Sequence, residues 1–427
     1  MQPSPLQPEN CRVTTDELSD LLPRFDQRGM DLQLDRMQGA LKHLGSPCGD
    51  IPAIQIAGTN GKGSIASFIS GVLHQNGIRC GVTTSPHLVS WCERIAIDGQ
   101  PIELADLRQL LNELASVFKT FQLTPFEQLL ASALVHFHRE TVDLLVLEVG
   151  LGGRLDATTA HPKRPLIAMA SIGLDHCEHL GSTLTAIATE KAAVITRESC
   201  VVSAEQHPDV RAVLENRCDQ QGAELRWVNP LDDSWCLGLA GELQRSNAAV
   251  ARGVLLALGP HGWPLSDNDL RTGFARARWN GRMQRVRWRN EPLLMDGAHN
   301  PAAAEQLNLE RRHWPGEKEG VNWILGIQAH KQGIAMLQTL LQPQDRAWIV
   351  PVPDHNSWTL EALLQRSPQW TQQWRQQWRQ QLIAASSVEQ ALVQINAPER
   401  RKSTVPVLAG SLYLIGDLLA RAVVTAE

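Results

Sequence analysis

Short apolar segments alternate with longer amphipathic segments through the first half of the chain. The apolar segments predict strands at residues 53–57, 80–83, 144–149, 166–172 and 200–203. The amphipathic segments predict helices over residues 64–76, 104–118 and 183–196. This alternation is typical of βαβ units, so we expect an α/β fold with a mostly parallel sheet and helices on both faces. Ligands of such sheets bind at the carboxyl ends of the strands.

A second α/β unit begins after about residue 285. Its predicted strands are residues 293–295, 322–325, 347–350 and 405–408. A chain of 427 residues is also long for a single hydrophobic core. We therefore expect two domains, residues 1–285 and residues 286–427, of which the second is the smaller.

A segment rich in Trp and Gln, residues 369–381, stands out within this second unit. Trp370, Trp374 and Trp378 recur every four residues, which on a helix makes one aromatic stripe. We favour a helix packed on its own domain, because no clustered basic groove accompanies the stripe as it would in a nucleic-acid stacking platform. The sequence assigns this segment no function.

The composition is that of an ordinary globular protein, with 43% hydrophobic and 20% charged residues. A net charge of -5 gives no reason to expect a nucleic-acid partner. No stretch is apolar enough to span a membrane, and Met1-Gln2-Pro3-Ser4 carries no signal-peptide pattern. The eight cysteines include no C-x-x-C pair, so we expect reduced thiols and a cytoplasmic protein.

The first candidate site follows the first predicted strand and reads Ala57-Gly58-Thr59-Asn60-Gly61-Lys62-Gly63-Ser64. Glycines let backbone N–H groups converge, the next helix adds positive potential and Lys62 adds a full charge, so the segment predicts a phosphate-binding loop. The Ser64 hydroxyl is suited to a magnesium ion. The spacing differs from that of a standard P-loop, because two residues separate Gly58 from Gly61 and Gly63 precedes Ser64. A glycine-rich turn that binds nothing is the alternative.

A carboxylate and a glycine-rich turn end the third predicted strand. Glu148 is its last polar residue, and Gly150, Gly152 and Gly153 follow directly. A hard cation beside nucleotide phosphates needs an oxygen ligand on a rigid element, and Glu148 is suited to that role. An acid on the surface at a strand end is the alternative. The glycines favour the first interpretation, because they allow close approach of a ligand to the backbone.

Three weaker candidates also lie at or after strand ends. His176 follows the fourth predicted strand and is suited to a metal or a phosphate, although lone histidines are more often structural. Lys191 lies in a helix rich in Ala and Ile, where it is either an anion ligand, a carbamate or a lysine on the helix surface. Asp296, His299 and Asn300 share one turn of the second unit, which is also ordinary loop chemistry.

Taken together and in this order, these motifs resemble the folylpolyglutamate synthase and dihydrofolate synthase family of the Mur ligase superfamily. The segments that carry the resemblance extend from near the amino end to the last dozen residues. They are GTNGKGS (58–64), TSPHLVSWCERIAIDGQPI (84–102), TPFEQLLASAL (124–134), LEVGLGGRLDATT (147–159), LDHCEHLGSTLTAIATEKAAVI (174–195), NGRMQ (280–284), DGAHNPAAAEQL (296–307) and GSLYLIGDL (410–418).

The resemblance implies a P-loop central domain of the Mur ligase type, which contains a pterin pocket, and a smaller Rossmann-like C-terminal α/β domain. It implies an ATP-dependent acid–amino-acid ligase of folate biosynthesis that works as a monomer. The expected substrates are ATP, L-glutamate and either 7,8-dihydropteroate or the γ-carboxylate of a reduced folate. A carboxylate would attack the γ-phosphate of ATP, and the amine of L-glutamate would then displace phosphate from the acyl phosphate. Two magnesium ions are expected.

The resemblance also implies roles for individual residues. The implied nucleotide contacts are Gly58, Thr59, Asn60, Gly61, Lys62, Gly63, Ser64, Asn247, Arg282 and Asp296. The implied metal ligands are Ser64, Ser85 and Glu148 at the first magnesium and His176 at the second. Lys191 matches a carbamoylated catalytic lysine, and His299 would act beside the γ-phosphate or the glutamate. Asp156 would lie in the pterin pocket, and Ser411 near the incoming glutamate.

The sequence departs from the family at two places. Thr84 stands where many members have a second serine, and residues 328–332 replace a Lys-Asp-Lys-Asp stretch near the implied glutamate site. A bifunctional dihydrofolate and folylpolyglutamate synthase is the leading hypothesis. The alternatives are folylpolyglutamate synthase activity alone, a Mur-type ligase acting on a cell-wall precursor, and a binding module that hydrolyses ATP without ligation. Residues 155–159 and 296–300 argue against the cell-wall ligase.

Overall fold

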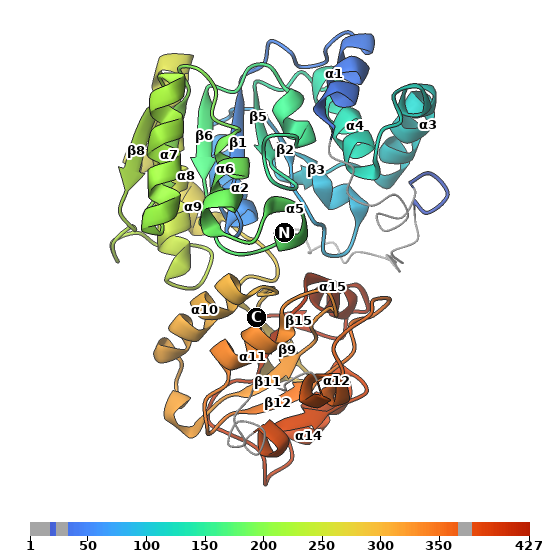
Figure 1. The fold of residues 1–427 in the computed structure, drawn as a ribbon, viewed down its shortest axis with the longest axis vertical. Coiled ribbons are helices and arrows are strands. Elements are labelled where there is room, and N and C mark those ends of the chain that lie inside the picture. The colour runs from blue at the N-terminus through green and yellow to red at the C-terminus, as the bar shows by residue number, and fades with distance from the viewer. Residues whose placement is uncertain (1–17, 23–32, 366–377) are drawn as a thin grey trace, which may run out of the picture.

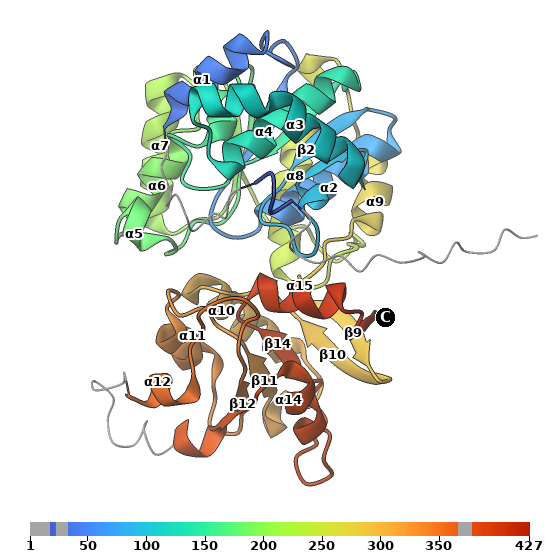
Figure 2. The same ribbon diagram turned by 90° about the vertical axis from the view of Figure 1, so that its right-hand side faces the viewer.

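The computed structural model describes residues 18–22, 33–365 and 378–427, and these residues form two β-sheets, each with its own helices (Figure 1). We call the part built on the eight-stranded sheet the first lobe and the part built on the seven-stranded sheet the second lobe. Figure 2 shows the same two lobes from the side, with α15 of the second lobe (Leu412–Ala420) facing the first. The expected α/β fold is confirmed.

The first sheet is parallel except at one edge. Its strand order is β4-β3-β2-β5-β1-β6-β7-β8, and only β3 and β4 run antiparallel to their neighbours. The strands are β1 (Ala53–Ala57), β2 (Cys80–Thr83), β3 (Ile95–Ile97), β4 (Gln100–Pro101), β5 (Leu144–Glu148), β6 (Leu166–Met169), β7 (Cys200–Ala204) and β8 (Glu224–Val228). Because β2, β5, β1 and β6 are neighbours, the loops after these four strands meet at one edge of the sheet.

Helices cover both faces of this sheet. One face packs against α2 (Lys62–Gln75), α8 (Leu243–Leu256) and α9 (Asp267–Arg276). On the other face, α1 (Leu34–His43), α3 (Leu104–Phe121) and α4 (Pro125–Arg139) form one apolar core, while α6 (Leu184–Ala192) and α7 (Pro208–Gln221) form a second. A short helix, α5 (Cys177–Leu180), precedes α6.

The second sheet has the order β13-β12-β11-β14-β10-β9-β15. It is parallel from β13 to β10, and β9 runs antiparallel to both of its neighbours. The strands are β9 (Gln284–Trp288), β10 (Glu291–Met295), β11 (Asn322–Leu325), β12 (Arg346–Ile349), β13 (Leu382–Ala384), β14 (Val407–Ala409) and β15 (Thr425–Ala426).

The helices of the second lobe also lie on both faces of its sheet. α10 (Pro301–Glu310), α11 (Gly333–Leu340) and α12 (Leu360–Gln365) share one apolar core, and α14 (Val388–Ile395) and α15 share the other. Trp378 is fully buried in the first of these cores, whereas Trp370 and Trp374 lie outside the described residues. Among the helices of the described residues, none has the length and apolar character needed to cross a membrane.

The sequence pattern predicted the parallel strands of both sheets except β8 and β13. It missed β8 and β9 because their polar and apolar residues alternate, as in QRVRW of β9, so neither forms an apolar run. The second sheet therefore begins at Gln284, and the expected division into residues 1–285 and 286–427 falls inside β9. That division stays a prediction.

A buried ion pair fixes the turn that precedes β12. Asp345 and Arg311 have side-chain exposures of 0% and 1%, and two Arg311 nitrogens donate to the Asp345 carboxylate at 2.9 and 3.1 Å. The same carboxylate accepts hydrogen bonds from the backbone N–H of Val321 and of Gln342 and from the Trp323 indole. Asp345 therefore joins the start of β11, the start of β12 and the end of α10.

We expect Asp345→Ala to be the most destabilising polar substitution in the second lobe. It would leave the buried Arg311 guanidinium with only the Glu317 carboxylate, 3.3 Å from its Nε. Loss of one partner of a buried ion pair typically costs about 3–5 kcal/mol. Chemical unfolding followed by circular dichroism measures this loss. The exposed residue Glu399 is a suitable control, because Glu399→Ala should change the free energy of unfolding by less than about 0.5 kcal/mol. Equal stabilities of the two variants would contradict this account.

Candidate active site between the two lobes

The glycine-rich segment forms a tight loop between β1 and α2. Gly61 has a left-handed backbone with φ of 96°, and α2 begins at the next residue, so the helix N-terminus faces the loop. A Cβ at Gly61 would lie 2.4 Å from the Asn247 side-chain oxygen, and one at Gly63 would lie 2.7 Å from the Trp279 indole. The extra glycine of this unusual spacing thus makes room for Trp279. The N-terminus of α2 at this loop suits an anion.

Two lysines lie at the same carbonyl group of this loop. Lys62 Nζ donates to Gly58 O at 3.3 Å and to Thr59 O at 3.2 Å, and Lys191 Nζ donates to Gly58 O at 2.9 Å. Lys191 comes from α6 and is only 5% exposed. Burial, together with the nearby Lys62 charge, lowers the pKa of Lys191 to about 7. This lysine therefore supplies a neutral amine in a substantial share of molecules near neutral pH.

The glycine turn after β5 positions Lys191. A Cβ at Gly153 would lie 2.8 Å from Glu190 O and 3.0 Å from Lys191 O. The backbone N–H of Arg154 also donates to Glu190 O. The absence of a side chain at Gly153 thus allows helix α6 to pack closely against this turn.

Glu148 and Ser64 offer oxygen atoms beside the loop. Glu148 ends β5 and pairs in register with Ile56 of β1, and its carboxylate accepts the Ser85 N–H at 3.3 Å. Burial raises the pKa of Glu148 to about 7, against the opposing effect of the Lys62 charge. Ser64 is 1% exposed, and its hydroxyl oxygen has no hydrogen-bond partner within the described part of the chain. A buried hydroxyl without a partner and an adjacent carboxylate fit a hard cation.

The described side chains alone do not complete a metal-binding cluster. Within the described ranges, no group of three or more His, Cys, Asp or Glu side chains has metal-ligand geometry. Magnesium keeps several water ligands and takes further oxygens from phosphates, so the arrangement at Ser64 and Glu148 suits magnesium bound with a nucleotide.

A small pocket opens next to Glu148. It is lined by Thr83, Thr84, Arg94, Phe126, Leu129, Leu130 and Glu148. Arg94 is 8% exposed, and its Nε donates to Nδ1 of His87 at 2.8 Å. Phe126 lies against Gly150, where a Cβ would be 2.7 Å from its ring. Sequence reasoning missed Arg94 and Phe126 as lining residues, because both are ordinary helix or strand residues in the local pattern.

Two carboxylates expected at ligand sites accept hydrogen bonds from nearby turns. Asp156 is 1% exposed. One of its oxygens accepts the backbone N–H groups of Gly150 and Leu151, and the other accepts the backbone N–H and the hydroxyl of Thr158. Asp296 accepts the N–H groups of Met283 and Ala298. These bonds hold the turns in which both residues lie. Contacts of Asp156 with a pterin and of Asp296 with a ribose stay predictions.

Three other predicted residues lie at the edges of the site. Asn247 is 5% exposed on α8 and contacts Gly61. The Arg282 guanidinium lies next to Gly297, at the turn that carries His299. Ser411 is 1% exposed and precedes α15, and the preceding residue, Gly410, donates its N–H to Ala298 O of the same turn. These contacts place the Ser411 backbone beside the turn after β10.

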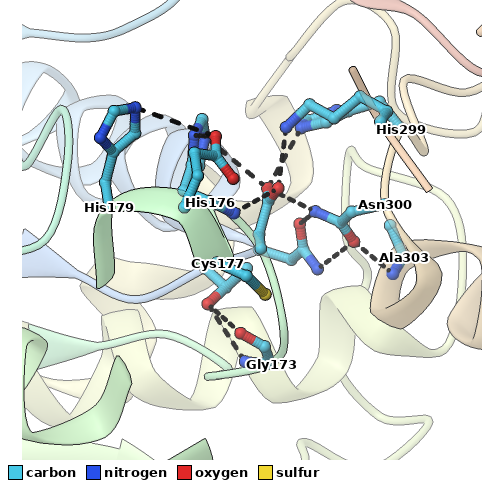
Figure 3. A network of polar contacts seen from close by, with 12 residues as sticks. Gly173, His176, Cys177, His179, His299, Asn300 and Ala303 are labelled. Atoms are coloured by element: carbon cyan, nitrogen blue, oxygen red, sulfur yellow. Dashed lines mark hydrogen bonds and ion pairs between the residues drawn. The ribbon is translucent and has the colours of Figure 1, made fainter. Parts of the chain in front are cut away.

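A polar network joins the two lobes above the phosphate loop (Figure 3). His299 of the second lobe has Nδ1 2.8 Å from Gly297 O and Nε2 3.6 Å from the Asp175 carboxylate of the first. Because a carbonyl only accepts, Nδ1 of His299 carries the proton in that bond. Asn300 donates to Asp175 at 2.9 Å, and its side-chain amide exchanges two hydrogen bonds with Asn60 of the loop. The site therefore contains residues from both lobes.

His176 lies beside this network. Its backbone N–H donates to the Asp175 carboxylate at 2.9 Å, and it precedes the short helix α5. Burial and the nearby Lys331 charge lower the pKa of His176 to about 4, so the imidazole is neutral at pH 7. A neutral imidazole is the form that binds a metal. Sequence reasoning assigned no role to Asp175 or Lys331, although both lie in segments compared with the family.

The comparisons with known proteins agree with this geometry. Residues 280–421 match a family model described as dihydrofolate synthetase, C-terminal domain. The dihydrofolate synthetase of Saccharomyces cerevisiae is 32% identical over 91% of this chain and 97% of its own length. The dihydrofolate synthase/folylpolyglutamate synthase of Escherichia coli is 32% identical over 81% of this chain and 83% of its own.

Solved structures are similar over almost the whole chain. The folylpolyglutamate synthase of Mycobacterium tuberculosis, complexed with ADP and AMPPCP, has a TM-score of 0.81 and 29% identity over 94% of this chain and 98% of that one. The match therefore includes both lobes and the site between them. This chain therefore belongs to the dihydrofolate synthase and folylpolyglutamate synthase family.

Proposed function

We propose that this chain ligates L-glutamate to 7,8-dihydropteroate and to the γ-carboxylate of reduced folates, using ATP. One arrangement of residues carries the proposal. Lys62 and Lys191 lie at one carbonyl of the loop, beside Glu148. His299 and Asn300 of the second lobe face this loop. Joining a carboxylate to the γ-phosphate of ATP brings two anions together, which requires concentrated positive charge. Lys62 would supply part of that charge, and a cation held by a carbamate on Lys191 would supply more. ATP is the co-substrate, and the remaining substrates are small molecules.

The residues of the loop have distinct roles in this proposal. Lys62 and the N–H groups at the start of α2 hold the β- and γ-phosphates, which would replace the loop carbonyls that Lys62 now contacts. Asn247, Arg282 and Asp296 lie at the edge of the nucleotide site. Ser64, Ser85 and Glu148 would hold one magnesium ion and His176 a second. Magnesium would supply charge neutralisation at the phosphates.

Lys191 fits the carbamate that the family resemblance implies. The neutral amine adds to carbon dioxide, forms an N–C bond and releases one proton, so a buried lysine with a pKa near 7 is suited to this step. The carbamate would be an anion at the position where Lys191 now donates to Gly58 O, and it would attract a second cation to the side of His176.

The reaction follows in two balanced steps. An oxygen of the acid substrate attacks the γ-phosphorus, the bond to the β-phosphate oxygen breaks, and ADP leaves with that electron pair. The glutamate amine then attacks the acyl carbon, loses a proton and expels inorganic phosphate. The pocket beside Glu148 is partly apolar and contains an aromatic ring, which suits the flat ring system of the acid substrate. Domain closure would keep water from the acyl phosphate.

Release of phosphate must depend on L-glutamate if this proposal holds. With ATP, magnesium and an acid substrate, we expect omission of L-glutamate to reduce steady-state phosphate release by about 10-fold or more, since the amine is required for turnover. Phosphate release that is indifferent to L-glutamate would instead identify an ATP-hydrolysing module. We further propose that the chain acts as a monomer, which light scattering during size-exclusion chromatography measures directly.

Two magnesium ions are expected in the complex with a non-hydrolysable ATP analogue and bicarbonate. Ser64→Ala should remove the ion held with Glu148, because the buried hydroxyl is lost while the fold keeps a side chain of nearly equal volume. Equilibrium dialysis with manganese as a spectroscopic substitute counts the ions. Ser70→Ala, on the same helix but a turn and a half further from the loop, is the control. One bound ion in the unmodified protein would contradict the assignment of His176.

A further inference from the structure

Asp175 of the first lobe contacts several side chains of the second lobe, although no sequence motif assigns it a role. Its carboxylate accepts a hydrogen bond from Lys331 Nζ at 2.8 Å and another from Asn300 Nδ2 at 2.9 Å, with His299 at 3.6 Å. All three partners belong to the second lobe, and Asp175 belongs to the first. The side chains of Asp175 and Lys331 are only 11% and 10% exposed. These are the contacts of a buried interface.

A second contact ties the same interface to the phosphate loop. Asn300 donates to Asn60 Oδ1 at 3.1 Å and accepts from Asn60 Nδ2 at 3.2 Å. The oxygen of Asn300 also accepts the Ala303 N–H at 2.8 Å, which caps α10. Asn300 is 1% exposed and therefore has little freedom to turn away. The position of α10 is thereby coupled to Asn60, two residues before Lys62.

The negative charge of Asp175 is paired with the positive charge of Lys331 only while the two lobes are in contact. If the second lobe moved away, the Asp175 carboxylate would lose Lys331 and Asn300 in one step and would have to be rehydrated. Conversely, removal of Lys331 alone would leave Asp175 partly buried with fewer donors, which penalises the closed arrangement. A small pocket beside these contacts is lined by both lobes, with Cys177 and Glu178 from the first and His330 and Gln332 from the second.

We propose that Asp175, Lys331 and Asn300 form a latch that holds the second lobe on the phosphate loop and so controls the fate of the acyl phosphate. All three are positioning residues. The consequence for the reaction rests on the proposed function. In the closed state the acyl carbon is attacked by the amine, which yields the amide, phosphate and a proton. In an open state water attacks instead and yields the original acid and phosphate, so ATP is consumed without ligation.

The first test measures the arrangement of the lobes without any reaction. Small-angle X-ray scattering of the full chain gives its radius of gyration, and Lys331→Met keeps most of the side-chain length while removing the charge. Asn300→Asp keeps the acceptor that caps α10 but removes both donors and sets a second carboxylate beside Asp175. We expect both variants to have a larger radius of gyration than the unmodified chain. Lys318→Met is the control, because Lys318 is exposed in the same lobe.

The second test measures how much of the released phosphate comes from ligation of glutamate and how much from hydrolysis by water. The ratio of phosphate released to glutamate incorporated should be near one for the unmodified chain, and that result alone tests the proposed function. For Lys331→Met and Asn300→Asp we expect the ratio to rise about tenfold, the factor that loss of a charge-assisted hydrogen bond typically brings. Lys318→Met should leave it unchanged.

Two results would overturn the latch. Scattering curves of Lys331→Met and Asn300→Asp that superimpose on that of the unmodified chain would remove its structural basis. A rise in KM for glutamate at an unchanged ratio would assign Lys331 to substrate binding instead. Circular dichroism and thermal unfolding of each variant confirm that the chain is folded, so an unfolded variant is recognised before scattering is interpreted.

Discussion

Lys191→Ala is expected to lower kcat by about 10²-fold or more while changing the affinity for ATP only slightly. The reason is that Lys191 lies under the loop, at the Gly58 carbonyl, where its group acts on charge that develops at the γ-phosphate. Lys62, which begins α2, remains to bind the nucleotide. Steady-state kinetics with calorimetric titration of the ATP analogue separate the two effects.

Variants of Lys191 also distinguish a carbamate from a plain cation. Lys191→Glu supplies a carboxylate near the position of the carbamate, and we expect it to retain more activity than Lys191→Gln. Because burial lowers the pKa of Lys191 to about 7, carbamate formation should be favoured above pH 7 and lost as the pH falls below it. Lys42→Ala on the exposed side of α1 is the control. Unchanged kcat in Lys191→Ala would refute the role of the carbamate.

His299→Ala is expected to reduce ligation by about 10²-fold, while the first lobe stays folded. His299 lies opposite Asp175, and its ring is oriented by the Nδ1 bond to Gly297 O, so its removal leaves a gap where the second lobe faces the phosphates. The measurement is the rate of glutamate incorporation, accompanied by thermal unfolding and binding of the ATP analogue. We expect both of the latter to be near those of the unmodified chain.

The matched control for His299 is His313→Ala, an exposed histidine of the same lobe. It should leave ligation unchanged. If His299→Ala ligated glutamate as fast as the unmodified chain, the second lobe would not contribute to the chemistry, and the interlobe network would be a structural contact only.

Local patterns predicted the parts of the fold that are continuous in sequence. The apolar runs of β1, β2 and β5 stand out because parallel strands are buried on both faces, and the loop from Gly58 to Ser64 lies directly after one of them. Glu148 could be anticipated beside that loop, because the ends of adjacent parallel strands meet at one edge of a sheet.

Contacts between distant segments could not be read from such patterns. Lys191 reaches Gly58 across 133 positions, and Lys331 reaches Asp175 across 156. Neither pair has a periodicity or spacing that relates its members. The four hydrogen bonds that Asp156 accepts within its own turn were also not predicted, because the sequence shows no spacing that identifies them.

The most direct test of the proposed function is phosphate release with ATP, magnesium and L-glutamate in two parallel reactions, one with 7,8-dihydropteroate and one with a reduced folate monoglutamate. The account predicts release in both, each dependent on L-glutamate. Release with the folate alone would restrict the chain to folylpolyglutamate synthesis. Absence of release in both reactions would contradict the assignment of this site to folate-dependent glutamate ligation.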